Sequence, residues 1–518
     1  MRKSNAMSFE TITNIITDVG LTILRGPTGS EGNYIAWKEG GYIDTNSIRF
    51  FKYVSKDGAL LNDAESEQMR MPPELREKLG AAAVPSVLKR QIESYAAIGG
   101  AVKVYPKDVY RIPSALNIPY VFNANIASQD VEEIVWMAAE IKAVTRHPIY
   151  IELGNELYEP GYKQQFPTAR EYAQKARVIY QKVKAVDPSI KIGVVLSQNY
   201  TSEKYLVSSG VRTVAKGLRP ESPIRRYNDW NGIIAEYTDS FDAIIIHPYD
   251  MPPRPLLEQT PESLMTWMMA RNEVFDEVMR TDFPKQFPGK EIWLTEYGIL
   301  PEEMFGNPDE SVKARMQFLK SPGASVVNMD LILRWMQNPV ITITAKHTLF
   351  DRQGFGIVQM GGTNSDEIIK LPDYYIFQAL GRLIKNNNVI YRISMAGIST
   401  NSIHQEWNHI SQAKEIVDIQ LGTAGAFGLG DAQGVTKIIF INRVNAPQTV
   451  TVKDHKLRPF WCYGGSVPFP NYQSNHSKGW RAPPDVLPVP EKIIADFSAG
   501  IKLQPYSATI ADCMYSAK

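Results

Sequence analysis

Short runs of apolar residues alternate with longer stretches in which apolar residues recur every three or four positions, from about residue 9 to residue 350. The short runs predict strands, and the longer stretches predict helices. The predicted strands are residues 21–25, 119–125, 149–156, 190–196, 241–247, 291–296 and 341–347. The predicted helices are residues 12–19, 86–98, 131–144, 169–186, 261–279 and 312–336. Apolar strands separated by helices indicate a parallel sheet that is covered on both faces.

Polar residues gather at the carboxyl ends of these predicted strands, where a (β/α)8 TIM-type barrel builds its active site. The fold class predicted for this part of the chain is therefore α/β, a (β/α)8 barrel. Seven of its strands can be assigned, and an eighth would have to lie before residue 9, where the residues are mostly polar. Either this first strand is irregular or the chain lacks it.

The pattern changes after about residue 370. One predicted helix, residues 374–384, is followed by short segments separated by Gly, Asn and Pro. These segments predict strands at residues 389–394, 416–421, 437–441, 448–452, 458–463 and 501–510. Such a series is typical of an antiparallel β-sandwich. We therefore expect two domains, a catalytic barrel over residues 1–370 and a β-sandwich domain over residues 371–518.

Composition narrows the classes of partner. The 518 residues include 56 Lys and Arg and 55 Asp and Glu, which leaves a formal net charge of +1. Nucleic-acid binding needs a concentrated cationic face, so no nucleic-acid partner is expected. A hydrophobic content of 44% is enough for a sizeable core, and no run of 18 apolar residues predicts a membrane span. Aromatic residues make up 10%, and they can build cores or serve as platforms for sugar rings.

Other site and compartment signals are few. Cys462 and Cys513 cannot form a disulfide framework for a chain of this size, and their pairing is left open. The seven histidines show neither His-x-His nor His-Glu-x-x-His spacing, so no metal and no cofactor are predicted. The amino terminus lacks the apolar segment of a signal peptide. The expected location is secreted or periplasmic if a leader has been removed, and cytoplasmic otherwise.

Two glutamates carry the chemistry that the sequence points to. Glu156 ends the motif Gly154-Asn155-Glu156 after one predicted strand, and Glu296 lies in Leu294-Thr-Glu-Tyr-Gly298 after another. Retaining glycoside hydrolysis needs one carboxylic acid beside the leaving oxygen and one ionised carboxylate on the opposite face of the sugar. Strand ends of one barrel can aim two such groups at a shared axis. The retaining mechanism then predicts a separation of roughly 5 to 5.5 Å between the two carboxyl groups.

The motifs around these glutamates resemble those of clan A retaining glycoside hydrolases, in particular the α-L-arabinofuranosidase-like families 51, 39 and 79. The matching segments, in chain order, are Leu24-Arg-Gly-Pro-Thr-Gly29 with Asn33 and Trp37, Gly154-Asn-Glu156, Ile246-His-Pro-Tyr249, Thr295-Glu-Tyr-Gly298 and Leu503-Gln-Pro-Tyr-Ser-Ala-Thr-Ile510. The resemblance spans nearly the whole chain. In the first segment, Gly-Pro-Thr-Gly stands where those families have Pro-Gly-Gly.

The resemblance implies a role for each matching residue. Glu156 would be the general acid/base and Glu296 the nucleophile. Asn155 would bind the 2-hydroxyl of the sugar. Arg25 and Tyr249 would contact the nucleophile carboxylate, whose pKa they would keep low and whose orientation they would fix. His247 would line the subsite of the bound sugar.

Several residues keep more than one interpretation. His247 could be a packing histidine and Arg25 a structural ion-pair partner. Trp37 and Tyr158 are candidates for stacking on sugar, and Tyr297 is a further substrate-binding candidate because it follows Glu296 directly. Trp335 lies in a helical pattern, where core packing is the expected role. Two further carboxylates are not expected to be catalytic, since Glu152 lies within a strand, where its charge needs a partner, and Glu159 follows in a loop.

The predicted function is that of a retaining glycoside hydrolase that cleaves plant or algal polysaccharides or oligosaccharides, similar to an α-L-arabinofuranosidase. An endo-β-1,4-glucanase or xylanase on the same scaffold is the alternative within the hydrolases. From a different class, an inactive carbohydrate-binding protein would keep this fold. The sequence predicts a carbohydrate partner and leaves the sugar and the oligomeric state open.

Overall fold

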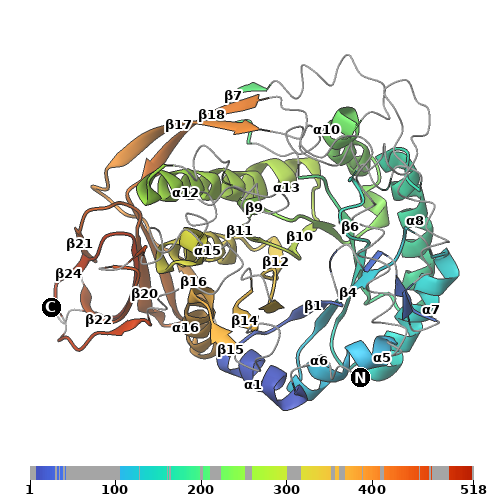
Figure 1. The fold of residues 1–518 in the computed structure, drawn as a ribbon, viewed down its shortest axis with the longest axis horizontal. Helices are drawn as coiled ribbons and strands as arrows, with labels where there is room; N and C mark the ends of the chain where they lie inside the picture. The colour runs from blue at the N-terminus through green and yellow to red at the C-terminus, as the bar shows by residue number, and fades with distance from the viewer. Residues whose placement is uncertain are drawn as a thin grey trace, which may run out of the picture.

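The computed structural model describes residues 8–42, 105–299, 317–469 and 489–515, with gaps inside these ranges, chiefly 210–222, 253–258, 361–367 and 409–413. Two sequence predictions lie outside the described residues, namely the helix at 86–98 and an eighth strand before residue 9. The amino-terminal part is a curled parallel sheet with helices around its outside, and antiparallel sheets form the carboxyl-terminal part (Figure 1).

The parallel sheet contains all seven predicted strands, in the order β1-β4-β5-β6-β8-β10-β12. Their bounds are β1 Leu24–Gly26, β4 Tyr120–Ala124, β5 Ile149–Leu153, β6 Lys191–Val195, β8 Ala243–Ile245, β10 Glu291–Leu294 and β12 Ile341–Thr344. Every neighbouring pair in this order is parallel. The predicted parallel sheet is therefore confirmed, and the curl around which the helices pack is that of a TIM-type sheet (Figure 1).

The helices that cover the sheet are α1 Phe9–Val19, α5 Pro106–Val109, α6 Arg111–Leu116, α7 Val131–Val144, α8 Ala169–Val186, α10 Pro223–Ala235, α12 Pro261–Glu277, α13 Phe283–Gln286, α15 Pro322–Met336 and α16 Pro372–Asn386. Their starts follow from local chemistry. The Asp130 side chain accepts a hydrogen bond from the Glu133 amide, and Thr168 forms a capping box with Glu171. A π-helical turn, residues 278–282, joins α12 to α13.

The inward face of the sheet supports the site above it. Strand register places Glu152 opposite Gly193, and Trp293 opposite Ile245. A Cβ on Gly193 would lie 2.7 Å from the Trp293 ring, so the glycine makes room for this buried indole inside the curl. Because side chains alternate along a strand, Glu152 points to the same inner face as Tyr150, whose ring contacts Trp293 at 5.4 Å.

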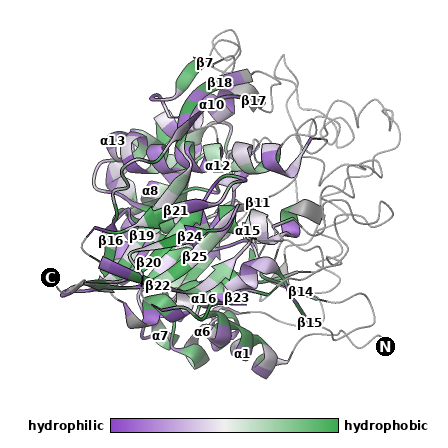
Figure 2. Cartoon of the chain, turned by 90° about the vertical axis from the view of Figure 1, so that its left-hand side faces the viewer, coloured by the Kyte–Doolittle hydropathy of each residue, from purple (hydrophilic) through white to green (hydrophobic). Residues whose placement is uncertain are grey.

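The carboxyl-terminal part contains a six-stranded antiparallel sheet in the order β16-β19-β20-β25-β22-β23 and a two-stranded sheet, β21-β24. The bounds are β16 Val389–Arg392, β19 Ala424–Asp431, β20 Gly434–Asn442, β21 Gln448–Thr451, β22 His455–Tyr463, β23 Glu491–Lys492, β24 Gly500–Leu503 and β25 Ser507–Tyr515. An apolar cluster joins the two sheets, with Ile438 and Phe440 against Ile501 and Leu503. Hydrophobic residues line β20, β24 and β25 (Figure 2). Antiparallel pairing is confirmed, and the complete sandwich stays a prediction.

Three details of this part differ from the sequence prediction. The expected strand 501–510 is two strands, because Gln504-Pro505-Tyr506 breaks it and Tyr506 has a positive φ of 42°. Strand β19 was missed because its glycines are typical of turns. Strand β17, Thr400–Asn408, was missed because polar residues dominate it.

A third antiparallel sheet links the two parts of the chain. Its order is β17-β18-β7, with β18 at Lys414–Gly422 and β7 at Leu206–Ser209. Strand β7 belongs to the segment that follows β6, far from β18 in the sequence (Figure 1). The Asp418 amide donates to the Tyr205 carbonyl at 3.0 Å, which extends the pairing by one bond. The expected division at residue 370 falls between β15 (Ile368–Lys370) and α16, and it stays a prediction.

Two smaller expectations can be compared with the structure. Cys462 in β22 is buried, Cys513 in β25 is partly buried, and both are free thiols. Among the helices that the structure describes, not one has the length and apolar composition needed to cross a membrane.

Candidate active site

Polar side chains from most strands of the parallel sheet meet at the carboxyl edge of the sheet. The residues concerned are Arg25 in β1, Asn155 and Glu156 after β5, Gln198 after β6, His247 and Tyr249 after β8, Glu296 after β10, and His347 after β12. Tyr249 begins the short strand β9, Tyr249–Asp250, which pairs with β11, Gly298–Ile299. This edge is where barrel enzymes of this type carry out their chemistry, so the row defines a candidate active site.

Glu296 is 6% exposed and holds a hydrogen bond at each carboxylate oxygen. The Arg25 guanidinium donates from Nη1 to Oε1 at 2.6 Å, and the Tyr249 hydroxyl donates to Oε2 at 2.6 Å. Burial by itself would raise the pKa of this carboxyl. The positive charges of His247, Arg25 and His347 and the hydrogen bond from Tyr249 outweigh that effect, and the pKa of Glu296 lies well below its usual range. Glu296 is therefore held as a carboxylate.

The loop after β1 closes over this carboxylate. A Cβ on Gly29 would lie 3.0 Å from Oε1 of Glu296, so the loop backbone comes close to the nucleophile candidate. Asn33, further along the same loop, accepts from the Asn155 amide at 2.8 Å and donates to the Asn155 carbonyl at 2.8 Å. This pair of bonds joins the first loop of the sheet to the Gly154-Asn155-Glu156 turn.

Glu156 lies on that turn with a positive φ of 49°, a conformation that few residues other than glycine adopt. Its side chain is 21% exposed, three times the 7% of the Glu296 side chain. Its Oε1 accepts from the Gln198 amide at 3.1 Å and from the Tyr158 hydroxyl at 3.2 Å. The carboxyl group of Glu296 is therefore enclosed by protein, whereas that of Glu156 faces solvent.

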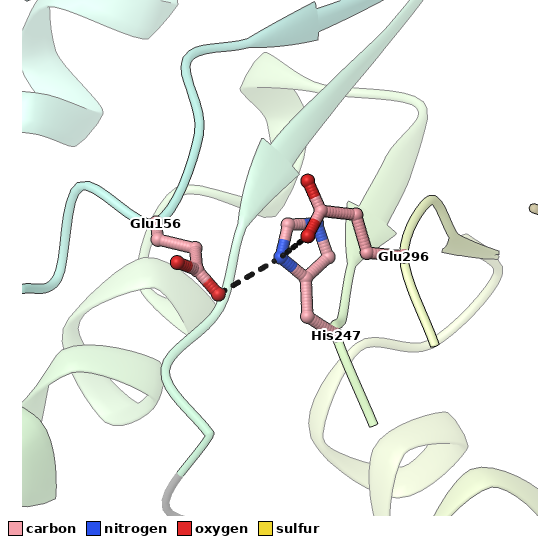
Figure 3. A group of neighbouring side chains, drawn as sticks. All are labelled: Glu156, His247 and Glu296. Carbon is pink, nitrogen blue, oxygen red and sulfur yellow. Dashed lines mark hydrogen bonds and ion pairs between the residues drawn. The ribbon is translucent and has the colours of Figure 1, made fainter. Parts of the chain in front are cut away.

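His247 lies between the two glutamates (Figure 3). Its Nδ1 is 3.1 Å from Oε1 of Glu156 and 3.8 Å from Oε2 of Glu296. Its Nε2 is 3.0 Å from the Thr295 hydroxyl, which fixes the plane of the ring. Burial lowers the pKa of this imidazole, but the nearby carboxylates have the larger combined effect and raise it. The ring is thus buried, hydrogen-bonded to Glu156 and within ion-pair distance of Glu296.

The two carboxyl groups are close to each other. Glu156, His247 and Glu296 each contribute one ligand-type atom, and these three atoms lie within 4.8 Å of one another. The same three groups are the part of the described chain that could hold a metal ion. The fit to a metal is poor, because Arg25 and Tyr249 already bond the two oxygens of Glu296 at 2.6 Å each. A guanidinium beside the carboxylate also opposes a second cation there.

Arg25 is the bridge between the nucleophile candidate and the sheet interior. Its Nε and Nη2 donate to the two oxygens of Glu152 at 3.0 and 2.7 Å, while Nη2 also donates to Oδ1 of Asn155 at 2.7 Å. Glu152 is 0% exposed. Burial acts to lower the pKa of Arg25, but Glu152 and Glu296 raise it overall, so the guanidinium stays charged. Arg25 is thus both a structural ion-pair partner, of Glu152, and a contact of the nucleophile candidate, Glu296.

The aromatic candidates are packed rather than open. Trp37, Tyr158 and Tyr297 are each 0 to 1% exposed and belong to the main core. Tyr297 packs edge-on against Trp335 at 5.1 Å, and Tyr158 packs against Tyr227 at 5.3 Å. Tyr158 alone of the three has a described bond to one of the glutamates. A ring must be exposed to stack on sugar, so the burial of these aromatics does not support stacking, and their substrate-binding role stays an untested prediction.

Sequence reasoning did not select four residues that the structure brings to the site. Gln198 and Thr295 bond Glu156 and His247, and Glu152 pairs with Arg25. The fourth is His347, whose Nδ1 is 2.8 Å from the Tyr249 hydroxyl and 3.9 Å from Oε2 of Glu296. Gln198, Thr295 and His347 each lie one to three residues beyond a strand, which is the signal that could have identified them.

Comparison with known proteins places the fold in a class. No family model matches the chain, and no curated protein matches it. Among solved structures, the fold of this chain is similar to those of several α-L-arabinofuranosidases. The resemblance seen in the sequence motifs is therefore confirmed at the level of the fold.

Three of these structures cover nearly the whole chain. The α-L-arabinofuranosidase of Thermotoga maritima is 14% identical, with 97% of this chain and 89% of that chain covered and a TM-score of 0.58. The family 51 α-L-arabinofuranosidase AbfB of Bifidobacterium longum is 12% identical, with the same two coverages and a TM-score of 0.61. The family 51 enzyme of Thermotoga petrophila RKU-1 is 13% identical, covers 99% and 92%, and has a TM-score of 0.60.

Proposed function

We propose that this protein is a retaining glycoside hydrolase, built on a (β/α)8-type barrel with a carboxyl-terminal β-sandwich, that cleaves O-glycosidic bonds in plant or algal polysaccharides or oligosaccharides. One observation carries the proposal: two glutamates in different environments have carboxylate oxygens within 4.8 Å of each other. Retaining enzymes separate their carboxyl groups by about 5 to 5.5 Å and inverting enzymes by roughly 6.5 to 9.5 Å. An oxygen-to-oxygen distance of at most 4.8 Å lies on the short side of these two ranges, which supports the retaining mechanism.

In the first step, Glu296 is the nucleophile. One of its oxygens forms a bond to the anomeric carbon as the bond from that carbon to the leaving oxygen breaks. Glu156 gives its proton to the leaving oxygen, so the aglycone departs as an alcohol. The low pKa of Glu296 suits a group that must be ionised before it attacks, and the greater exposure of Glu156 suits a group that meets both the aglycone and water.

In the second step, Glu156 is the general base. It takes a proton from water, the water oxygen bonds to the anomeric carbon, and the ester to Glu296 breaks. Glu296 regains its charge and Glu156 its proton. His247 hydrogen-bonds Glu156 and lies 3.8 Å from Glu296, while Arg25 donates to both Glu296 and Asn155. Asn155 would bind the 2-hydroxyl of the sugar, an interaction that strengthens in the oxocarbenium-like transition state.

For the substrate, we propose an α-L-arabinofuranoside as the first choice. The solved structures that share this fold over nearly the whole chain are α-L-arabinofuranosidases by name, which supports the choice. A panel of 4-nitrophenyl glycosides tests it, with α-L-arabinofuranoside, β-D-xyloside and β-D-glucoside as members, followed by product analysis on arabinan, xylan and β-glucan. Release of oligosaccharides from xylan or β-glucan alone would favour the endo-acting alternative, and tight binding without release of reducing sugar would favour a carbohydrate-binding protein.

The decisive test of the mechanism compares the two glutamates. Glu156→Ala should lose activity on substrates with poor leaving groups, keep it on activated aryl glycosides, and gain rate with azide, because azide replaces the water that Glu156 activates. Azide should not rescue Glu296→Ala. Glu159→Gln is the matched control, since Glu159 lies three residues from Glu156 and bonds Tyr227 instead. Wild-type rates in either alanine variant would overturn the assignment.

A further inference from the structure

Glu152 is a buried carboxylate directly beneath the candidate site. It is 0% exposed, lies in β5 on the inner face of the curled sheet, and accepts from Arg25 at both oxygens, at 2.7 and 3.0 Å. Its Oε1 is also 3.8 Å from Nε2 of His247. Arg25 donates to Glu152 and Glu296 at the same time. One guanidinium therefore links Glu296, the proposed nucleophile, to Glu152, which would form no bond to the sugar.

The proposed reaction changes the charge on one side of this bridge. In the free enzyme, Arg25 has two carboxylate partners among the described residues, Glu152 and Glu296. When Glu296 becomes an ester to the sugar, its negative charge disappears. A buried cation that loses its counter-charge is strongly unfavourable in a protein interior. Arg25 is buried with a side chain only 6% exposed, so water cannot replace the lost partner.

We propose that Glu152 is a positioning residue that acts through Arg25 as the permanent counter-charge of the glycosyl-enzyme. The proposal rests on the proposed function, because it concerns the covalent intermediate of that reaction. Glu152 keeps Arg25 neutralised after Glu296 has lost its charge, and its two-point bond holds the guanidinium in one orientation throughout. The intermediate is thereby stabilised relative to the free enzyme, without any contact between Glu152 and the sugar.

A purely structural ion pair predicts something different. Loss of a brace would impair both chemical steps together, because the whole site would loosen. Loss of a counter-charge has a direction: it disfavours the step in which Glu296 loses its charge and spares or assists the step in which Glu296 regains it. The ratio of the two rates therefore distinguishes the two roles, and stability does not enter that ratio.

The experiment measures both steps with 2,4-dinitrophenyl α-L-arabinofuranoside, and with the matching β-D-xyloside and β-D-glucoside if the first is not a substrate. In stopped-flow, the pre-steady-state release of dinitrophenolate reports formation of the glycosyl-enzyme. Its hydrolysis is measured separately, from the decay of glycosyl-enzyme that has been freed of excess substrate. Glu152→Gln, which removes the charge and keeps the shape, should slow formation on the order of 10- to 100-fold and leave hydrolysis unchanged or faster. Asp330→Asn is the control, since Asp330 is also 0% exposed and paired with arginines, but on α15.

An unchanged ratio of the two rates in Glu152→Gln would overturn the proposal, whether both steps are slowed equally or neither is slowed. Glu152→Asp keeps the charge and covers the case in which the Gln variant does not fold. It should form the intermediate within about threefold of wild type. A tenfold slower formation in folded Glu152→Asp would contradict the counter-charge role. Wild-type inactivity on all three probes would instead contradict the proposed function, so the two failures are distinct.

Discussion

Two clusters of buried charged residues in this molecule both contain carboxyl and guanidinium groups, but they differ in the ratio of negative to positive groups. The bracing cluster comprises Asp330 and Arg334 of α15, Glu273 of α12, and Arg443 just after β20. Arg334 and Arg443 bond the two oxygens of Asp330 at 2.9 and 2.6 Å, and Arg334 also bonds Glu273 at 2.6 Å. Two guanidinium groups thus face two carboxylates, and the formal charge of this cluster is zero.

The second cluster, called the catalytic cluster for its proposed role, comprises Arg25, Glu152, Glu156, Glu296 and His247. These five residues provide three carboxyl groups, one guanidinium and one imidazole. Each acid of the bracing cluster is paired with a permanent cation, whereas Glu156 bonds an imidazole, a phenol and an amide and no arginine or lysine among the described residues. The difference teaches that the balanced cluster joins helix α15 to the segment after β20, whereas the excess of carboxyl groups lies where the proposed function needs an acid and a nucleophile.

The largest expected effect comes from the closed acid of the catalytic cluster. Glu296→Ala should lower kcat by about 10^4-fold or more on any substrate, because no described carboxylate can take its place as nucleophile. Initial rates with an activated aryl glycoside measure this loss. The folded state should survive, which circular dichroism and thermal unfolding check. A variant that keeps more than a tenth of wild-type kcat would remove Glu296 from the mechanism.

The bracing cluster should respond in stability rather than in rate. Asp330→Ala leaves Arg334 and Arg443 without their shared carboxylate, and we expect a loss of about 3 to 5 kcal/mol in the free energy of unfolding. Denaturant titration at pH 7 gives this value, with kcat/KM of the folded protein unchanged. A variant as stable as wild type but impaired in kcat would reverse the comparison between the clusters.

The pH dependence of the stability that the bracing cluster provides follows from the direction in which the pKa of Asp330 is shifted. Burial would raise the pKa of Asp330, but Arg334 and Arg443 outweigh it, and the pKa is lowered in the fold. The contribution of Asp330 to stability is therefore present above its unfolded pKa of about 3.9 and is lost as the pH falls through the lower folded value. Wild type should lose stability in that acidic window more steeply than Asp330→Asn.

A smaller effect is expected when a neutral donor is removed from the catalytic cluster. Tyr249→Phe deletes the hydrogen bond to Glu296 and the contact with His347 at 2.8 Å, and kcat/KM should fall by about 10- to 100-fold, equivalent to roughly 1.5 to 3 kcal/mol. Because that bond helps to lower the pKa of Glu296, its loss raises the pKa. The acid limb of the pH profile of kcat/KM should then move to higher pH. A limb that moves to lower pH, or does not move, would contradict this account.

The smallest expected effect is that of a chelator. Glu156, His247 and Glu296 have the spacing of a metal site, but Arg25 and Tyr249 occupy the oxygens of Glu296. Dialysis against EDTA should therefore leave kcat/KM unchanged within experimental error. A loss that is restored by one divalent ion would show that the cluster holds a metal and would require a different mechanism.

The sequence predicted the sheet because most of its strands, such as β6 and β8, lie in short runs rich in apolar residues. The helices at 131–144 and 169–186 also match α7 and α8, where capping residues mark the starts. Polar or glycine-rich strands such as β17 and β19 could not be found in this way. Their side chains give no alternation, and only pairing with neighbouring strands defines them.

Residues of the site could be predicted where they belong to a recognisable motif. They could not be predicted where only the fold brings them close to the site. Glu156, Glu296, Arg25 and Tyr249 were selected from their motifs, and the structure brings them together. The partnership of Glu152 with Arg25 joins residues 127 positions apart and leaves no local pattern. Burial of Trp37 could not be foreseen either, because an indole on a loop is equally compatible with the core and with an open face.

Strand β7 limits how this protein can be divided. It is contributed by the segment after β6, yet its hydrogen-bonding partner is β18, more than 200 residues later in the chain. A fragment that ends at residue 370 would leave β7 as an unsatisfied edge, and a graft of the carboxyl-terminal part onto another barrel would lack that strand. A chimera in which the carboxyl-terminal part is moved onto another barrel of this fold should therefore carry residues 202–209 together with the β17–β18 hairpin.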